Sequence, residues 1–145
     1  MYKEIIQDSI DYIEENIKCD ISASELSEKA GFSLFHYYRL FQTAVGMPVM
    51  QYILRRRLLN AIYDIECGNK MIDVALLYGF ETHAGFYKAF AREFGCTPTQ
   101  YLKLHRVKKP YRINNDLSES RVIMPAKLWH CTLKGKYYVQ NKKCA

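Results

Sequence analysis

The stretch that decides the fold is Ala30-Gly-Phe-Ser-Leu-Phe-His-Tyr-Tyr-Arg-Leu-Phe-Gln42. Gly31 can adopt the positive φ that ends a helix in a tight turn, and Ser33 is a favoured N-cap for a following helix. At 100° per residue, one side of that second helix collects Leu34, Tyr37, Leu40 and Phe41. The opposite side collects Phe35, Arg39 and Gln42, with Tyr38 at its edge. The stretch predicts a short helix, a tight turn and a second helix with a polar and aromatic outer face, which is the helix-turn-helix pattern.

The same pattern returns later in the chain. Ala30-Gly31-Phe32 parallels Tyr78-Gly79-Phe80 at an offset of 48 residues. At an offset of 49 residues, Phe41 parallels Phe90, Gly46 parallels Gly95, and Gln51-Tyr52 parallels Gln100-Tyr101. A match spread over this length indicates that the helix-turn-helix occurs twice.

Helical hydrophobic spacing extends over the first 106 residues, and Ser22-Ala-Ser-Glu25 and Thr97-Pro-Thr-Gln100 fit capping boxes, so we expect an all-α fold. The expected helices cover 2–17, 22–29, 33–45, 48–66, 72–78, 82–94 and 97–106. At about 1.5 Å per residue, the segment 48–66 makes a helix about 28 Å long, which would connect the two copies. We therefore divide the domain 1–106 into a first subdomain (1–47), the connector (48–66) and a second subdomain (67–106).

After Val107 the helical pattern is lost. Residues 127–133 and 136–140 can pair as a β-hairpin across Lys134-Gly135, although a lone hairpin is marginally stable. This tail, 107–145, holds nine Lys or Arg and two Asp or Glu. Three roles remain open for it: a basic tail that follows DNA, a remnant of an effector region, or a hairpin that binds a partner.

Charge is distributed unevenly before the tail as well. Residues 29–106 carry ten basic and five acidic side chains, whereas the first 28 residues are acidic. The sequence therefore predicts a polyanionic partner for the middle and the tail, with the N-terminal helix facing away from it. No apolar run is long enough to cross a bilayer, and the N-terminus is too acidic for a signal peptide, so we expect a cytoplasmic protein.

Little in the sequence indicates catalysis. The five cysteines are far apart and lack metal-ligand spacing, which favours reduced thiols packed as small apolar groups. His130-Cys131 is the only adjacent Cys/His pair, and no orienting carboxylate is nearby. Neither a phosphate-binding glycine loop nor a metal triad is present, so we predict no enzyme activity, no cofactor and no metal.

Several motifs together resemble the AraC/XylS family of bacterial transcription regulators. They are Gly-Phe-Ser-x-x-x-x-x-Arg-x-Phe, Gly-x-Pro-x-x-Gln-Tyr, Ala75-x-x-x-Gly79-Phe80, Phe90 and Gly-x-x-Pro-x-x-Tyr. The resemblance covers about residues 4–105 and is strongest over 70–102. It implies seven helices, in which two helix-turn-helix subdomains are bridged by a long helix. It also implies a monomer that inserts two recognition helices into successive major-groove segments, with some bending of the DNA.

The first copy carries the stronger set of base contacts. The planar fork of Arg39 can reach guanine O6 and N7 together, and Phe35 can touch a thymine methyl group. Tyr38 and Gln42 can donate to bases or phosphates. These positions match those where the family places base contacts, and Ser33 begins the helix that carries them; the alternative is a solvated helix face.

The second copy predicts weaker reading of sequence. Ala84, Gly85, Lys88 and Arg92 face outward on its helical wheel, Thr82 can cap the helix, and His83 lies near its start. All six are candidate DNA contacts. The family commonly has polar side chains at the positions of Ala84 and Gly85, and arginine at that of Lys88. Because lysine is a point charge, this helix is expected to contact phosphates more than it discriminates between bases. His83 can reach a phosphate or be a plain surface histidine.

The connector carries Arg55-Arg56-Arg57 on three faces, so we expect one arginine to reach phosphate and another to pair with an acidic neighbour. Overall the sequence predicts a transcription activator that binds double-stranded DNA and contacts RNA polymerase with a face directed away from DNA. The alternative is an effector-sensing or interaction module, in which the tail docks a ligand or a partner.

Overall fold

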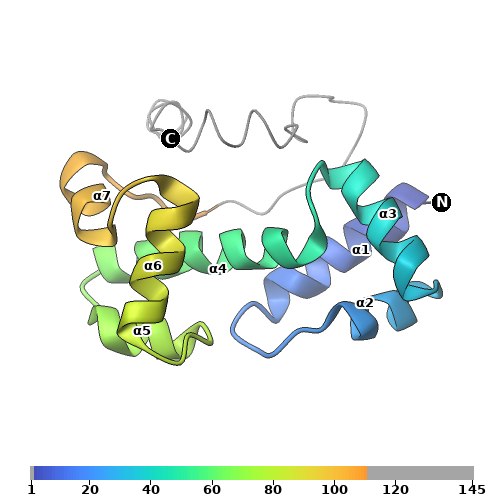
Figure 1. Ribbon diagram of the computed structural model, residues 1–145, viewed down its shortest axis with the longest axis horizontal. Helices are drawn as coiled ribbons and strands as arrows, with labels where there is room; N and C mark the ends of the chain where they lie inside the picture. Colours follow the sequence, from blue (N-terminus) through green and yellow to red (C-terminus); the bar gives the residue numbers. More distant parts are fainter. Residues whose placement is uncertain (1, 111–145) are drawn as a thin grey trace. The chain divides into compact units, whose positions relative to one another are not determined.

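The structure is a computed structural model that describes residues 2–110, and within this range all regular elements are helices (Figure 1). They are α1 (Tyr2–Glu15), α2 (Ala23–Ala30), α3 (Leu34–Val45), α4 (Val49–Glu66), α5 (Met71–Leu77), α6 (His83–Phe94) and α7 (Pro98–Leu104). The all-α prediction is confirmed. None of the described helices is long and apolar enough to cross a membrane. The predicted hairpin 127–140 lies outside the described residues.

The described chain falls into two compact units, 2–56 and 57–110, and the boundary between them lies inside α4. The first unit therefore holds α1, α2, α3 and the start of α4. The second holds the rest of α4 with α5, α6 and α7. Each unit contains one helix-turn-helix, and each has a core of its own.

The core of the first unit is built from one stripe of each helix. Ile6, Ile10 and Ile13 of α1 are buried at the spacing that the sequence predicts, and they lie with Leu26, Tyr37, Phe41 and Tyr52. The rings of Phe41 and Tyr52 meet edge to face, with centroids 5.6 Å apart. Because such pairs stabilise beyond their buried area, α3 is fixed against the start of α4.

A buried ion pair also joins α4 to α1. Arg56 Nε donates to Glu14 Oε1 at 2.6 Å, and Arg56 Nη2 donates to Glu14 Oε2 at 3.1 Å. The Tyr52 hydroxyl donates to the same carboxylate at 3.1 Å. Three donors therefore satisfy one buried acid, and the predicted pairing of an arginine in 55–57 with an acidic neighbour is confirmed.

The second unit has an aromatic core. Phe86, Phe90 and Phe94 recur on the inner face of α6, and Phe90 stacks on Phe94 with centroids 4.4 Å apart. Tyr101 of α7 meets Phe90 edge to face at 5.3 Å. The Tyr78 hydroxyl donates to Asp64 Oδ2 of α4 at 2.7 Å, and burial together with this bond raises the pKa of Tyr78.

The two tight turns share one backbone geometry. Gly31 and Gly79 have φ of 76° and 86°, in the left-handed region that favours glycine. After each, the phenylalanine N–H reaches back five residues: Phe32 to the Ser27 carbonyl and Phe80 to the Ala75 carbonyl, both at 3.0 Å. The repeat seen in the sequence is therefore also a repeat of conformation.

Three local expectations are wrong. Leu34, placed on the inner side of its helix, is 40% exposed, because the first turn of α3 extends past the core that Tyr37 and Phe41 fill.

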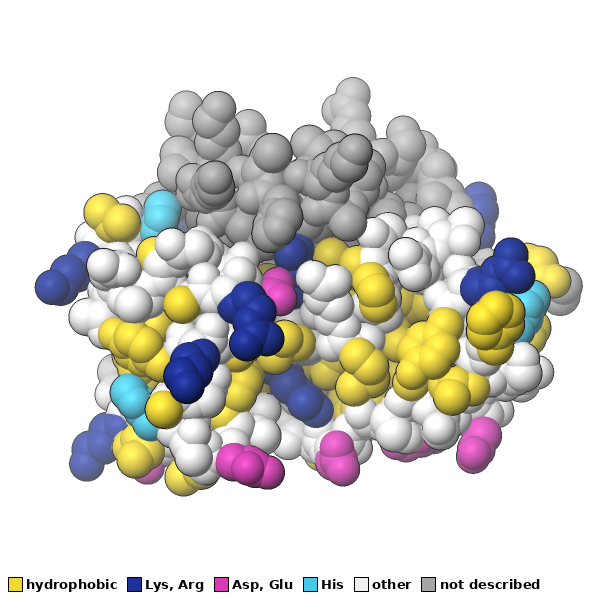
Figure 2. Space-filling view, in the orientation of Figure 1, with side chains coloured by type: hydrophobic (Ala, Val, Ile, Leu, Met, Phe, Trp, Pro, Cys, Tyr) yellow, Lys and Arg dark blue, Asp and Glu magenta, His cyan; other side chains and the backbone are white. Residues whose placement is uncertain are grey.

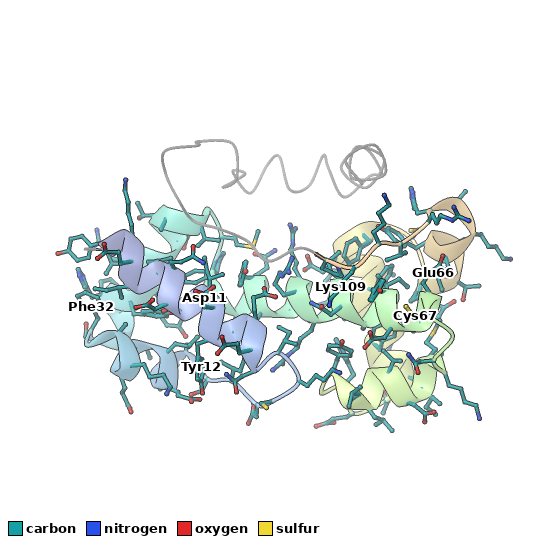
Figure 3. All side chains as sticks on the ribbon, turned by 180° about the vertical axis from the view of Figure 1, so that it is seen from behind. Asp11, Tyr12, Phe32, Glu66, Cys67 and Lys109 are labelled. Atoms are coloured by element: carbon teal, nitrogen blue, oxygen red, sulfur yellow. The ribbon has the colours of Figure 1, made fainter. Side chains whose placement is uncertain are left out.

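At α2, Ser22 accepts from the Glu25 N–H, but the Glu25 carboxylate bonds the Tyr12 hydroxyl of α1 and does not complete a capping box. Cys19 and Cys67 are exposed rather than packed, and Cys67 lies beside Glu66 at the end of α4 (Figure 3). The capping box at Thr97 and Gln100 is complete.

Candidate nucleic-acid interface

Helix α3 separates into an anchored face and an open face. Tyr37 and Phe41 are fully buried, and burial raises the pKa of Tyr37 to about 12. On the other side, the side chains that the sequence assigns to DNA are all exposed: Phe35, Tyr38, Arg39 and Gln42. Ser33 caps the helix, because its hydroxyl accepts the His36 N–H at 3.3 Å. The anchored face thus fixes which way the open face points.

Phe35 and Arg39 form a pair on this open face. The Phe35 side chain is 71% exposed, and the Arg39 guanidinium carbon lies 5.7 Å from the centroid of its ring. This is within the range of a cation–π contact, which restrains a long side chain that would otherwise sample many rotamers. In Figure 2, hydrophobic, basic and histidine side chains lie together over α3.

Helix α6 repeats the arrangement with smaller side chains. Phe86 and Phe90 anchor it, and the opposite face exposes the predicted residues Ala84, Gly85, Lys88 and Arg92. His83 is also exposed, in the first turn, where its ring lies 5.5 Å from that of Tyr87. Thr82 is the N-cap, and its hydroxyl accepts the Gly85 N–H at 2.9 Å. The structure therefore brings most of the predicted residues of each copy together on one helix face, with Ser33 and Thr82 at the two helix starts.

Gly85 has a local reason to lack a side chain. A Cβ at this position would lie 3.1 Å from Thr82 Oγ1, the atom that caps the helix. Two residues further on, the Tyr87 hydroxyl lies 3.1 Å from Thr99 Oγ1, and this hydrogen bond lowers the pKa of Tyr87. The open face of α6 thus has only the small residues Ala84 and Gly85 in its first turn, followed by the basic side chains of Lys88 and Arg92.

Two of the three neighbouring arginines of α4 are buried. Arg56 is committed to Glu14, and Arg55 is 3% exposed. Arg57 is half-buried, close to Gly79 at the second turn. The two buried arginines belong to the packing of the first unit. Of the three, Arg57 is therefore the one whose side chain is exposed enough to reach a phosphate.

Sequence reasoning missed two exposed apolar features. Leu34 lies beside Phe35 on α3, and the helical wheel misassigned it because it takes no account of where the core ends. On α5, the outer face carries Ile72, Leu76 and Leu77, together with Asp73. A face that is apolar and bears an acid is unsuited to phosphate, so it lies outside the nucleic-acid interface.

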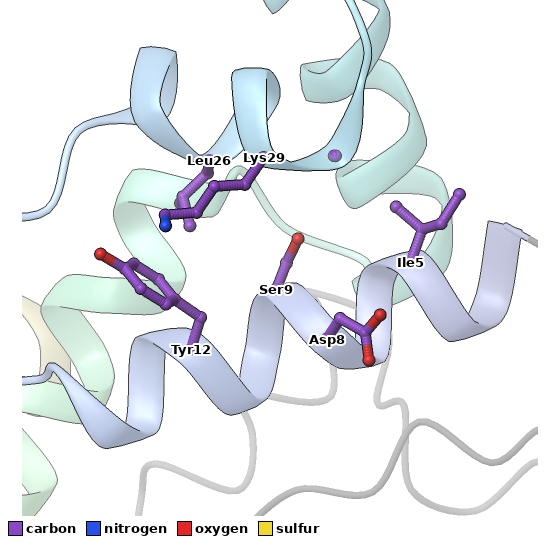
Figure 4. Close-up of a pocket in the computed structure, with 7 residues that line it drawn as sticks. Ile5, Asp8, Ser9, Tyr12, Leu26 and Lys29 are labelled. Carbon is purple, nitrogen blue, oxygen red and sulfur yellow. The ribbon is translucent and has the colours of Figure 1, made fainter.

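A hollow of about 220 Å³ lies between α1 and α2 in the first unit (Figure 4). It is lined by Ile5, Asp8, Ser9, Tyr12, Leu26, Lys29 and Ala30. The Lys29 ammonium lies 4.5 Å from the centroid of the Tyr12 ring, which ties α2 to α1. Since its floor is the acidic helix α1, this hollow is also outside the basic interface.

Comparison with known proteins agrees with this geometry. Residues 26–104 match the family described as a helix-turn-helix domain. The chain is 34% identical to the HTH-type transcriptional activator AarP of Providencia stuartii over 98 residues, which are 67% of the chain and 73% of AarP. It is 32% identical to the regulatory protein SoxS of Salmonella typhimurium over 101 residues, which are 69% of the chain and 94% of SoxS.

A longer protein also matches, over part of its length. The uncharacterized HTH-type transcriptional regulator YbfP of Bacillus subtilis is 36% identical over 101 residues, and the match spans 69% of the chain but 34% of YbfP. Among solved structures, the C-terminal domain of the two-component response regulator yesN from Fusobacterium nucleatum superposes with a TM-score of 0.58 and 30% identity, covering 68% of this chain and 95% of that domain. The chain belongs to the AraC/XylS family of helix-turn-helix transcription regulators.

Proposed function

We propose that this transcription regulator is an activator that binds DNA as a monomer, with α3 and α6 entering successive segments of the major groove. One observation carries the proposal: each helix follows a left-handed glycine turn and exposes a basic face opposite a buried aromatic face. This is the geometry of a recognition helix, whose inner side is fixed by the core while its outer side is free to meet base edges. Such a protein works in the cytoplasm, where bacterial DNA is.

The first copy supplies most of the sequence reading in this proposal. Arg39 contacts guanine, Phe35 contacts an apolar base edge, and Tyr38 and Gln42 donate to bases or phosphates. In the second copy, Lys88, Arg92 and His83 contact phosphate. The bare start of α6 at Ala84 and Gly85 lets the sugar-phosphate backbone approach closely, and Ser33 and Thr82 hold the two helix starts.

The domain proposal keeps the double helix-turn-helix separate from a basic tail, 107–145. Val107 is buried, so the residues just after α7 still contribute to the second unit. A truncation meant to remove only the tail should therefore begin after Pro110. The excess of Lys and Arg in the tail supports added contacts with phosphate.

DNA binding is tested by selecting bound sequences from a random duplex pool and measuring affinity at two salt concentrations. We expect one enriched site, and an affinity that falls steeply as salt rises, because each phosphate contact releases counterions. Enrichment of no particular sequence, or an affinity indifferent to salt, would contradict the proposal.

RNA polymerase is the proposed protein partner, and the outer face of α5 is the proposed contact. The exposed Ile72, Leu76 and Leu77 support this, because apolar side chains clustered on a helix that phosphate would not favour are suited to a protein surface. Leu76→Asp should leave DNA affinity unchanged and reduce transcription from a selected site with purified RNA polymerase. Leu104→Asp is the control, since Leu104 is an even more exposed leucine on α7; equal losses in both variants would remove α5 from the contact.

A further inference from the structure

The hollow between α1 and α2 has the size and the lining of a site for a small organic molecule (Figure 4). Its volume of about 220 Å³ is larger than the roughly 150 Å³ of a cavity that binds benzene. Ile5, Leu26 and Ala30 supply apolar walls, and Leu26 is almost fully buried. Apolar walls with a few polar groups among them are typical of ligand pockets.

Charges of opposite sign lie at the two ends of the hollow. Asp8 and Lys29 both line it, and both side chains are exposed to solvent. In Figure 4, the Lys29 side chain reaches from α2 toward the Tyr12 ring, whereas Asp8 lies nearer the start of α1. Asp8 and Tyr12 are one helical turn apart, which separates the two ends by about 6 Å at 1.5 Å per residue.

The Lys29 ammonium is held at its end of the hollow by the Tyr12 ring, whose centroid lies 4.5 Å away. Glu25 is the acid four residues before Lys29 on α2. Its carboxylate accepts the Tyr12 hydroxyl, and Glu25 is not among the residues that line the hollow. The hollow therefore presents a cation at this end.

A buried hydroxyl lies between the two charged ends. Ser9 is 7% exposed, and its side chain points from α1 toward α2 (Figure 4). A serine hydroxyl can donate to a carboxylate or accept from an ammonium, so it can support either polar group of a bound molecule.

This arrangement selects the charge pattern of the ligand. An anion without a positive group would face the Asp8 carboxylate, and a cation without a negative group would face the Lys29 ammonium. A neutral apolar molecule would take water from both charges and return nothing. A zwitterion avoids all three penalties, provided that its two charges are about as far apart as the two ends of the hollow.

We propose that this hollow binds a small linear zwitterion, an ω-amino carboxylate, with its carboxylate on Lys29 and its ammonium on Asp8. The methylene chain then packs against Ile5, Leu26 and Ala30. This site goes beyond the proposed function, because it lies outside the basic interface and does not depend on DNA. A ligand here joins α1 to α2, so it stabilises the first unit by mass action.

The first test follows the backbone amide signals of the full chain by NMR while amino acids of increasing length are added. Affinity should rise from glycine through 4-aminobutanoate to a maximum near 5-aminopentanoate and fall for 8-aminooctanoate, with the signals of Ser9 and Ala30 among those that shift. Hexanoate, which has a methyl group in place of the ammonium, and pentylamine, which lacks the carboxylate, should each bind about threefold to fivefold more weakly, the loss of one exposed ion pair. Absence of binding, or an affinity that ignores chain length, would overturn the proposal.

The second test assigns each charge to its residue. Asp8→Asn and Lys29→Met should each weaken binding of 5-aminopentanoate about threefold to fivefold. Asp8→Asn should leave hexanoate binding without loss, and Lys29→Met should do the same for pentylamine. The matched controls are Glu28→Gln and Lys3→Met, which change exposed charges on the same two helices outside the hollow and should have no effect. Equal losses in the controls would show a response to net charge and would overturn the site.

The third test fills the hollow. Ala30 is half-buried at its edge, so Ala30→Met places a longer apolar side chain where the methylene chain of the ligand would lie. Binding of 5-aminopentanoate should be lost while circular dichroism shows the same helical content. Binding that persists in the folded variant would place the ligand elsewhere and overturn the proposal, and the two charge variants decide the matter if this variant does not fold.

Discussion

At the scale of single residues, Arg39 and Lys88 differ in what their loss should do. Both are exposed on their helices. The planar guanidinium of Arg39 lies over the Phe35 ring, whereas Lys88 is a point charge on a helix that begins with the small residues Ala84 and Gly85. Arg39→Ala should cost about 1–3 kcal/mol against the preferred site and relax preference at one or two base pairs. Binding to the selected site and to its single-base variants measures this.

Lys88→Ala is the contrasting variant. It should weaken binding to all sequences alike and reduce the slope of log affinity against log salt by about 0.9, the effect of one phosphate contact. If Arg39→Ala behaved in this uniform way, Arg39 would be a phosphate contact. If Lys88→Ala changed preference at one base pair, the second copy would read sequence directly.

Residue-level prediction from the sequence succeeded where periodicity and local chemistry agree. Tyr37 and Phe41 were placed inward and are buried, and Thr82 was predicted to cap α6 and does so. It failed where a partner distant in sequence decides the outcome. Glu25 was expected to close a capping box and instead bonds Tyr12, while Leu34 lies beyond the end of a core that a helical wheel cannot delimit.

At the scale of elements, the ion pair between Glu14 and Arg56 should be the most sensitive link between α1 and α4. Their side chains are 10% and 5% exposed, so removing Arg56 leaves the buried Glu14 carboxylate with no opposite charge and only the Tyr52 hydroxyl as donor among the three described above. Arg56→Met should lower the free energy of unfolding by about 3–5 kcal/mol, as measured by urea denaturation. The double variant Glu14→Leu, Arg56→Met should lose less than the single one, since it buries no charge. Similar stability in the wild type and Arg56→Met would mean that aromatic packing alone holds the two helices.

Element order and type were predictable because each start and stop has a local cause. Gly31, Gly46 and Gly95 end helices in the left-handed region, and Ser33 and Thr97 begin them with hydroxyl caps. The fate of Arg55-Arg56-Arg57 was only partly predictable. Their burial depends on α1, whose Glu14 is 42 residues away from Arg56 in the sequence.

At the scale of the whole molecule, the basic excess of the tail predicts a contribution to affinity rather than to preference. A chain ending at Pro110 keeps the buried Val107 and loses seven of the nine basic residues in 107–145. We expect it to select the same site with lower affinity and a shallower salt dependence, because fewer counterions are released. Pool selection and salt titration of both chains measure this. Unchanged affinity would remove the tail from DNA and favour a partner-binding role.

The boundary inside α4 has a consequence for how the protein unfolds. Because the two units share one continuous helix, the hydrogen bonds that cross residues 56 and 57 belong to both. Each unit packs on its own part of that helix, the first through Tyr52 and the second through Asp64, so unfolding of one unit should fray the helix on which the other packs. The two copies of the motif are therefore expected to melt as a single cooperative transition, despite having separate cores.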